Sequence, residues 1–201
     1  MLTVKRAELE LEKALCRNQG PWGRHSRSVA ENARLIAEKT DALDPERAYV
    51  LGLMHDIGRR VGVTGMAHTL DGYDYMMELE QPEIGRICLT HSFPVKSLKQ
   101  FFGKIDVTPE RVAFLMEYLE RIEYDDYDRL IQLCDAISLP EGACIMEKRL
   151  VDVALRYGFV EGTLDKWRAF LNLKKYFDRL CGCSIYELLP NVLENSGADL
   201  V

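Results

Sequence analysis

Two adjacent polar residues, His55 and Asp56, interrupt an apolar stretch of the chain, AYVLGLMHDIGRR at residues 48–60. The residues before them would be apolar on nearly every side of a helix, which predicts that this helix is buried. Burying a polar group without a partner costs on the order of 2–7 kcal/mol, and burying a charge costs more. We therefore expect His55 and Asp56 to have a partner that offsets this cost.

Other residues raise the same question. His25 lies one helical turn before Val29, and His91 extends an apolar row of its own helix. Asp135 falls on the inward face of its helix, whereas His68 is a weaker case with acidic neighbours. Each could be a core residue with its own hydrogen-bond partner. A metal ion would satisfy all of them at once, and imidazole with carboxylate is the ligand mix of zinc, iron, manganese or nickel rather than of magnesium or calcium alone.

The elements that must position these residues are predicted to be helices, because apolar residues recur at helical spacing and no alternating strand pattern persists. Asp44, Pro45 and Glu46 are typical of a helix start, and Gly58 is expected to end that helix at Ile57. The predicted helices cover residues 3–16, 25–40, 45–57, 66–79, 83–92, 109–122, 126–138, 143–157 and 163–180, with a short helix after Ser184. We expect the tail, PNVLENSGADLV, to be frayed.

No repeat, low-complexity tract or long linker divides the 201 residues, so we predict a single all-α domain, a compact helical bundle over residues 1–201. The net charge of −6 and the pI near 5.3 argue against a partner such as long nucleic acid, because no basic excess exists to neutralise phosphates.

No apolar run approaches the ~18–20 residues that span a bilayer, and no signal-peptide pattern is present. The six cysteines lie mostly in apolar helical patterns, so we expect reduced thiols in a cytoplasmic protein without membrane contact.

With these residues in view, the chain resembles the HD-domain superfamily of metal-dependent phosphohydrolases, which carries a spaced H…HD…D pattern on a helical bundle. GRHSRSVAENARLIA contains His25, LGLMHDIGRR contains the doublet, and LIQLCDAISL contains Asp135. The resemblance covers about residues 22–140 and implies a metal-binding core there. Residues 141–195 are then interpreted as a helical extension of this HD-type domain.

A subset of that superfamily adds two histidines between the doublet and the last aspartate and holds two metal ions. MAHTLDGYDYM and ICLTHSFP place His68 and His91 in those positions. The resemblance implies that these histidines hold a second divalent transition metal, with Asp56 bridging it to the first. The expected ligands are His25, His55, Asp56, His68, His91 and Asp135. Iron is expected first, with manganese, zinc or nickel as alternatives; the subset includes diadenosine-tetraphosphate hydrolases of similar size.

Two metals in such a site could activate a water for attack on phosphorus, so the chain would need few catalytic side chains of its own. We expect Asp56 to be essential, and Arg59 or Arg60, directly after the doublet, to donate hydrogen bonds to a substrate phosphate. Arg24 and Lys96 are further candidates for phosphate binding, although each of these cations could equally be a solvated surface charge. The diadenosine-tetraphosphate hydrolase branch generally has a lysine soon after the doublet, whereas this chain has Arg59 and Arg60. The resemblance therefore does not identify the substrate.

The leading interpretation is a hydrolase of phosphoester or phosphoanhydride bonds in a nucleotide or similar small phosphorylated metabolite. Two alternatives stay open: a mixed-valence di-iron oxygenase of the same superfamily, and a non-catalytic module that senses nucleotides. Residues 141–201 show no recognisable chemistry, and the apolar residues of WRAFLNLKKYFDRL are interpreted as core packing or as a homodimer interface.

Overall fold

The structure is a computed structural model that describes residues 1–197, and it confirms the all-α prediction. Helices make up 69% of the described residues, and the only sheet among them is one antiparallel pair of two-residue strands. The elements in chain order are α1 (Val4–Arg17), α2 (Trp22–Glu38), α3 (Pro45–Met54), the 3-10 helix η1 (Ile57–Val61), α4 (Ala67–Glu78), α5 (Pro82–Thr90), the 3-10 helix η2 (Leu98–Gln100), α6 (Pro109–Arg121), α7 (Asp126–Ile137), β1 (Ser138–Leu139), β2 (Gly142–Ala143), α8 (Met146–Tyr157), α9 (Thr163–Cys181), α10 (Ile185–Leu188) and α11 (Val192–Gly197).

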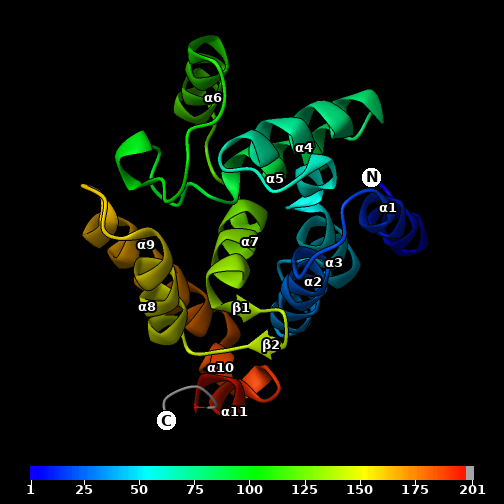
Figure 1. Cartoon of the computed structure of the whole chain (residues 1–201). Coiled ribbons are helices and arrows are strands. Elements are labelled where there is room, and N and C mark those ends of the chain that lie inside the picture. The colour runs from blue at the N-terminus through cyan, green and yellow to red at the C-terminus, as the bar shows by residue number, and fades with distance from the viewer. Residues whose placement is uncertain (198–201) are drawn as a thin grey trace.

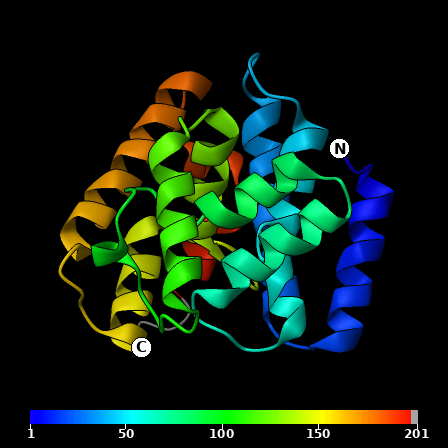
Figure 2. The same cartoon turned by 90° about the horizontal axis from the view of Figure 1, so that it is seen from above.

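Helix α7 stands in the middle of the molecule, with the α8–α9 pair on one side and the α2–α3 pair on the other (Figure 1). Helices α4 and α5 pack against each other at one end of α7, and α4 also contacts η1. Helix α1 covers the outer side of α3. Seen from above, α1 and α9 lie at opposite sides of the molecule (Figure 2). Three groups of helices therefore surround α7.

Two apolar cores hold these helices together. The larger core joins α1, α2, α3 and α7 to the C-terminal helices, and Ile57 belongs to it. The smaller core joins α4, α5 and α6 and includes Met66 and Leu70. Each fully buried leucine, isoleucine or methionine stabilises the fold by about 1.5–3 kcal/mol. Because Asp56 precedes Ile57 and His68 lies between Met66 and Leu70, the larger core fixes the segment of Asp56 and the smaller core fixes that of His68.

Helix α3 begins as predicted, since the Asp44 side chain accepts a hydrogen bond from the Arg47 backbone N–H at 2.7 Å. The predicted end was wrong: α3 stops at Met54, and the chain continues as η1. Gly58 does not terminate a helix. A Cβ atom at this position would lie 1.9 Å from the carbonyl oxygen of His68, so glycine is required because η1 and α4 pack backbone against backbone.

The C-terminal part also differs from the prediction. The helix expected over 143–157 starts later, because the β1–β2 hairpin precedes α8, and the single short helix expected near the end is two helices, α10 and α11. The tail is helical over Val192–Gly197 rather than frayed, and Asn195 donates a hydrogen bond to the Ala143 carbonyl at 2.8 Å. The rest of that prediction falls on 198–201, outside the described residues.

Neither a disulfide nor a membrane-spanning helix occurs within residues 1–197. All six cysteines are free thiols, and four of them are buried. Burial raises the pKa of the Cys144 thiol to about 11, so this group stays protonated at neutral pH. None of the helices in the described part combines the length and the apolar character that crossing a membrane requires.

Candidate metal centre

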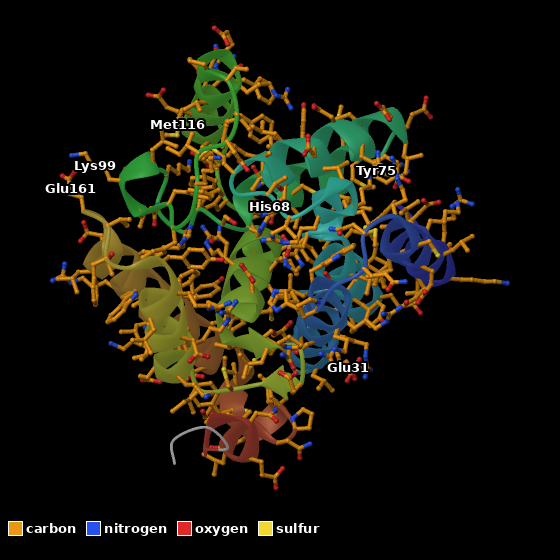
Figure 3. The ribbon with its side chains drawn as sticks, viewed as in Figure 1. Glu31, His68, Tyr75, Lys99, Met116 and Glu161 are labelled. Atoms are coloured by element: carbon orange, nitrogen blue, oxygen red, sulfur yellow. The ribbon has the colours of Figure 1, made fainter. Side chains whose placement is uncertain are left out.

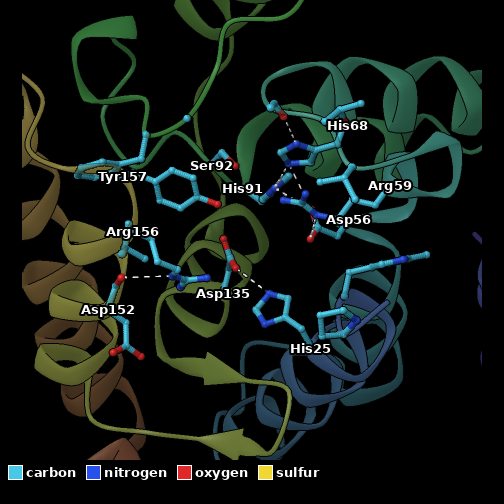
Figure 4. A pocket seen from close by; sticks show the side chains of 18 of the residues that line it. His25, Asp56, Arg59, His68, His91, Ser92, Asp135, Asp152, Arg156 and Tyr157 are labelled. Carbon is cyan, nitrogen blue, oxygen red and sulfur yellow. Dashed lines mark hydrogen bonds and ion pairs between the residues drawn. The ribbon is translucent and has the colours of Figure 1, made fainter. Parts of the chain in front are cut away.

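The structure brings together all six residues that the sequence analysis expected to bind metal. Figure 4 labels five of them, all except His55. His25 is on α2, His55 and Asp56 connect α3 to η1, His68 is on α4, His91 follows α5, and Asp135 is on α7. We call these six residues the His/Asp cluster. The cluster is assembled from five separate segments of the chain. Its member His68 lies near the middle of the molecule, whereas Lys99 and Glu161 form an ion pair at the edge of the molecule (Figure 3).

Asp56 is at the centre of the cluster. Its Oδ1 atom lies 3.2 Å from Nε2 of His68 and 3.6 Å from Nε2 of His91. Its Oδ2 atom lies 3.8 Å from Nε2 of His55. The two histidines that face Oδ1 are 3.3 Å apart, measured between their Nε2 atoms. One carboxylate thus faces histidine ring nitrogens with both of its oxygens.

Asp135 holds the other end of the cluster. Its Oδ1 atom lies 3.0 Å from Nε2 of His25 and 3.9 Å from Nε2 of His55. The possible ligand atoms of these three residues all lie within 4.8 Å of one another. The same holds for a second group, His55, Asp56 and His91. The two groups share His55, so they form one continuous set of possible metal ligands.

Three of the histidine rings are oriented by backbone carbonyl groups of the preceding turn. Their Nδ1 atoms lie within hydrogen-bond distance of these carbonyl oxygens: 2.7 Å for His55 and Gly52, 3.2 Å for His91 and Ile87, and a short contact for His68 and Gly65. An Nδ1–H group that donates to a carbonyl leaves Nε2 with a free lone pair. Because all three Nε2 atoms face Asp56, the rings present this lone pair to the centre of the cluster.

Two atoms of the cluster are buried without a hydrogen bond: Nε2 of His55 and Oδ1 of Asp56. An unsatisfied buried polar atom costs about 1–3 kcal/mol. Both atoms carry a lone pair, and so does each Nε2 atom nearest to them. Lone pairs that face one another cannot form hydrogen bonds among themselves, but all can bind one cation. The residues present therefore fit a divalent metal ion.

The protonation states agree with this reading. Burial lowers the pKa of His68 to about 4 and that of His91 to about 3, so both rings are neutral at pH 7. Burial by itself would raise the pKa of Asp56, but the adjacent Arg59 guanidinium holds that pKa well below its usual range. Neutral imidazole and charged carboxylate are the forms that bind metals.

Arg59 orients Asp56. Its Nε atom donates to Oδ2 of Asp56 at 2.5 Å, and its own carbonyl accepts a hydrogen bond from the Asn18 side chain at 2.6 Å. The second contact ties η1 to the end of α1. Arg59 also lines the cavity beside the cluster, and hydrogen bonding from Arg59 to a substrate phosphate stays a prediction.

The other three cations that the sequence analysis singled out lie elsewhere. The guanidinium of Arg60 stacks on the Tyr75 ring, 3.6 Å from its centroid, and Tyr75 lies away from His68 (Figure 3). Lys96 donates to the carbonyl of Ile122, and the side chain of Arg24 is 68% exposed. None of the three lines the cavity, so phosphate binding by them remains a prediction without geometric support.

A buried ion network positions His91. The fully buried Asp128 on α7 accepts hydrogen bonds from Nε of Arg86 at 3.0 Å and from the Thr90 hydroxyl at 2.7 Å. Gln132, one turn later on α7, donates to the Thr90 carbonyl at 3.0 Å. Because His91 directly follows Thr90, this network fixes the end of α5 against α7 and with it the His91 ring.

The cluster forms one wall of a cavity of about 1100 Å³. Helices α8 and α9 form the facing wall, which the sequence analysis missed (Figure 4). The polar and aromatic residues on that wall include Arg149, Arg156, Tyr157, Lys166 and Trp167. One signal could have revealed them: Lys166 shares a helical face with Phe170 and Phe177, so a charged residue continues an apolar row there, as His25 does on α2.

Metal removal is expected to destabilise the protein. A ligand present at 100 times its dissociation constant stabilises the folded state by about 2.7 kcal/mol, which for a chain of this size raises the melting temperature by roughly 5–10 °C. We expect that difference between protein dialysed against a chelator and the same protein with added Mn²⁺, Fe²⁺, Zn²⁺ or Ni²⁺, measured by thermal unfolding. An unchanged melting temperature with all four metals would contradict the assignment of a metal centre.

Comparison with protein-family models identifies the HD domain, whose model matches residues 22–139. That segment contains all six residues of the His/Asp cluster, whereas α8 and α9 lie beyond its end. No curated protein and no solved structure is similar enough to the chain to match it.

Proposed function

The chain belongs to the HD domain family, most of whose members are metal-dependent hydrolases, and we propose that it is a phosphohydrolase. In this proposal it cleaves a phosphoester or phosphoanhydride bond of a nucleotide or a similar small phosphorylated metabolite with a metal-activated water. The observation that carries the proposal is the placement of Asp56, whose two oxygens face histidine Nε2 atoms at 3.2–3.8 Å on the wall of a cavity.

We propose two divalent metals, with iron as the first choice. His25, His55, Asp56 and Asp135 would hold one of them, and His68 and His91 would hold the second together with Asp56. The unsatisfied Oδ1 atom of Asp56, with two ring nitrogens beside it, supports a second ion on that side. When bound, such metals lower the pKa of water and neutralise charge on phosphate oxygens.

The chain's own residues orient the ligands and receive the substrate. The backbone carbonyls of Gly52 and Gly65 and the side chain of Arg59 hold ring and carboxylate orientations before any substrate arrives. Such preorganisation lowers the reorganisation that the reaction requires. Arg59, with its Nε occupied by Asp56, still has the Nη groups of its guanidinium available to a phosphate oxygen at the cavity wall.

The number of metals can be tested with His68→Ala. We expect protein purified without added metal to contain about two equivalents of transition metal by elemental analysis, and the variant to contain about one, because only the second site loses a ligand that faces Asp56 Oδ1. Asp74→Ala on the same helix is a matched control, since Asp74 pairs with Arg111 rather than with the cluster. Equal metal content in the wild type and the His68 variant would make His68 a structural residue.

The reaction can be tested with a panel of nucleotides and phosphorylated metabolites. Release of phosphate or of a shorter nucleotide, dependent on added metal, is expected from the proposed phosphohydrolase. Oxygen consumption with an organic substrate and a strict need for iron would favour the di-iron oxygenase instead. Tight nucleotide binding without turnover in any of the metals would favour a sensing module.

A further inference from the structure

Three cations on α8 and α9 face the cavity without a carboxylate partner. They are Arg149, Arg156 and Lys166, and we call them the cationic wall. Among the described residues, no carboxylate oxygen lies within ion-pair distance of any of them; each donates to a backbone carbonyl instead. The acceptors are Ser138 for Arg149 at 3.1 Å, Asp152 for Arg156 at 3.3 Å, and Ser92 for Lys166 at 3.0 Å. In a chain with a net charge of −6, this is an unusual concentration of unpaired positive charge.

Lys166 is the buried member of the cationic wall. It is only 7% exposed, and its Nζ atom lies 5.3 Å and 5.7 Å from the ring centroids of Phe102 and Phe170. Burial lowers its pKa to about 8, so the amine is still mostly protonated at neutral pH. A buried ammonium group is unfavourable unless it is paired. The Lys166 ammonium group has three N–H donors, and the Ser92 carbonyl accepts a hydrogen bond from only one of them. An anion in the cavity would supply the missing partner.

The acidic residues of the cavity do not neutralise this wall. Asp56 and Asp135 belong to the His/Asp cluster. Asp106 accepts hydrogen bonds from the backbone N–H groups of Gly65 and Ala67, at 2.6 Å and 2.9 Å. Asp152 offers Arg156 its backbone carbonyl rather than its carboxylate. The positive charge on α8 and α9 therefore remains available to a ligand.

The cationic wall faces the His/Asp cluster. Figure 4 shows the Arg156 side chain extending toward Asp135, and the Tyr157 hydroxyl directed toward Ser92 and His91. The wall is also fixed in place, because the backbone N–H of Gly162, just before α9, donates to the Lys99 carbonyl at 2.8 Å. A cavity of about 1100 Å³ exceeds the ~300–1,000 Å³ typical of small-molecule sites, so it has room for a ligand that touches both walls.

We propose that the cationic wall binds a second anionic group of the substrate, so that the substrate carries at least two phosphate groups, one at the cluster and one at the wall. This inference rests on the proposed function, which assigns the cluster to the phosphate that is attacked. It makes Arg149, Arg156 and Lys166 specificity-determining residues, and it favours oligophosphorylated compounds over simple monophosphate esters.

The test uses stable probes with one or two anionic groups. Isothermal titration calorimetry on the full-length, metal-loaded protein would compare propylphosphonate with a series of alkane diphosphonates of one to five carbons, with the metal content checked after each titration. We expect the best diphosphonate to bind at least tenfold more tightly than propylphosphonate, because it adds charge-assisted hydrogen bonds to the wall. Arg156→Ala and Lys166→Met should each remove most of this preference and leave propylphosphonate binding within about twofold.

Two further variants sharpen the result. Arg156→Lys keeps the charge and should restore part of the preference, whereas Arg168→Ala should change nothing, because Arg168 is 70% exposed and pairs with Asp165 on the outside of α9. Arg156 is itself exposed, so its replacement leaves the core intact. The proposal is overturned if no diphosphonate binds more tightly than propylphosphonate, or if the Arg156 and Lys166 variants weaken both probes equally. A different outcome would contradict the proposed function instead: the wild-type protein binds diphosphonates through the cationic wall but does not bind propylphosphonate.

Discussion

Replacing Asp56 by asparagine is expected to abolish metal binding and to lower hydrolysis more than about 100-fold. Asparagine has nearly the size of aspartate but no charge, and one of its two terminal groups is an amide nitrogen without a lone pair for a metal. Loss of a residue that only supports a metal ligand costs 10–100-fold in affinity or activity, so loss of a ligand that faces both metal positions should cost more. Elemental analysis and a metal-dependent phosphate-release assay would measure the two effects.

Asp71→Asn is the matched control for this experiment. Asp71 is a half-buried carboxylate on α4 that lies outside the cavity, so the same chemical change there should leave metal content and turnover near wild type. If Asp56→Asn retained both metal equivalents and its activity, Asp56 would be only the ion-pair partner of Arg59, and the metal centre would have to be placed elsewhere.

Replacing Gly58 by alanine is expected to destabilise the protein by about 3 kcal/mol or more. The new Cβ would lie 1.9 Å from the carbonyl oxygen of His68 and 2.6 Å from the backbone nitrogen of Gly72. Both contacts are with backbone atoms of α4, so the helix itself must move, and such overpacking is among the most destabilising changes. We expect the melting temperature to fall by roughly 6–12 °C.

The same displacement should reduce metal binding, because it moves His68 away from Asp56. Gly197→Ala is the control, since a Cβ there meets no atom within 4 Å, and it should leave the melting temperature unchanged within about 1–2 °C. A Gly58 variant as stable as the wild type would show that η1 and α4 are not held in backbone contact.

The fold class was predictable from the sequence because helical periodicity depends on short-range spacing alone. The start of α3 at Asp44 and Pro45 follows from local chemistry in the same way. Its end did not, because the role of Gly58 is set by a carbonyl on α4, ten residues further along the chain. Local sequence carries no information about which backbone will pack against a glycine.

Part of the candidate site was also predictable. Inward-facing histidines and aspartates stand out in an apolar row because burial without a partner is unfavourable, and the structure brings all six of them together in one cluster. The phosphate-binding side was not predictable. Arg59 and Arg60 are neighbours in sequence, yet one lies on Asp56 in the cavity and the other stacks on Tyr75. Adjacent side chains on a 3-10 helix point in different directions, and only the surrounding fold decides which direction leads to the site.

Asp128 and Asp135 show most clearly where the sequence stops being informative. Both are acids on α7, and the sequence alone determined that such acids, if buried, need a positive partner. The tertiary structure decided which partner each one has: Asp128 pairs with Arg86 of α5, whereas Asp135 meets His25 and His55 at the cavity. The physical reason is that an arginine satisfies a buried carboxylate within the protein, whereas histidine side chains can bind a metal ion together with the carboxylate.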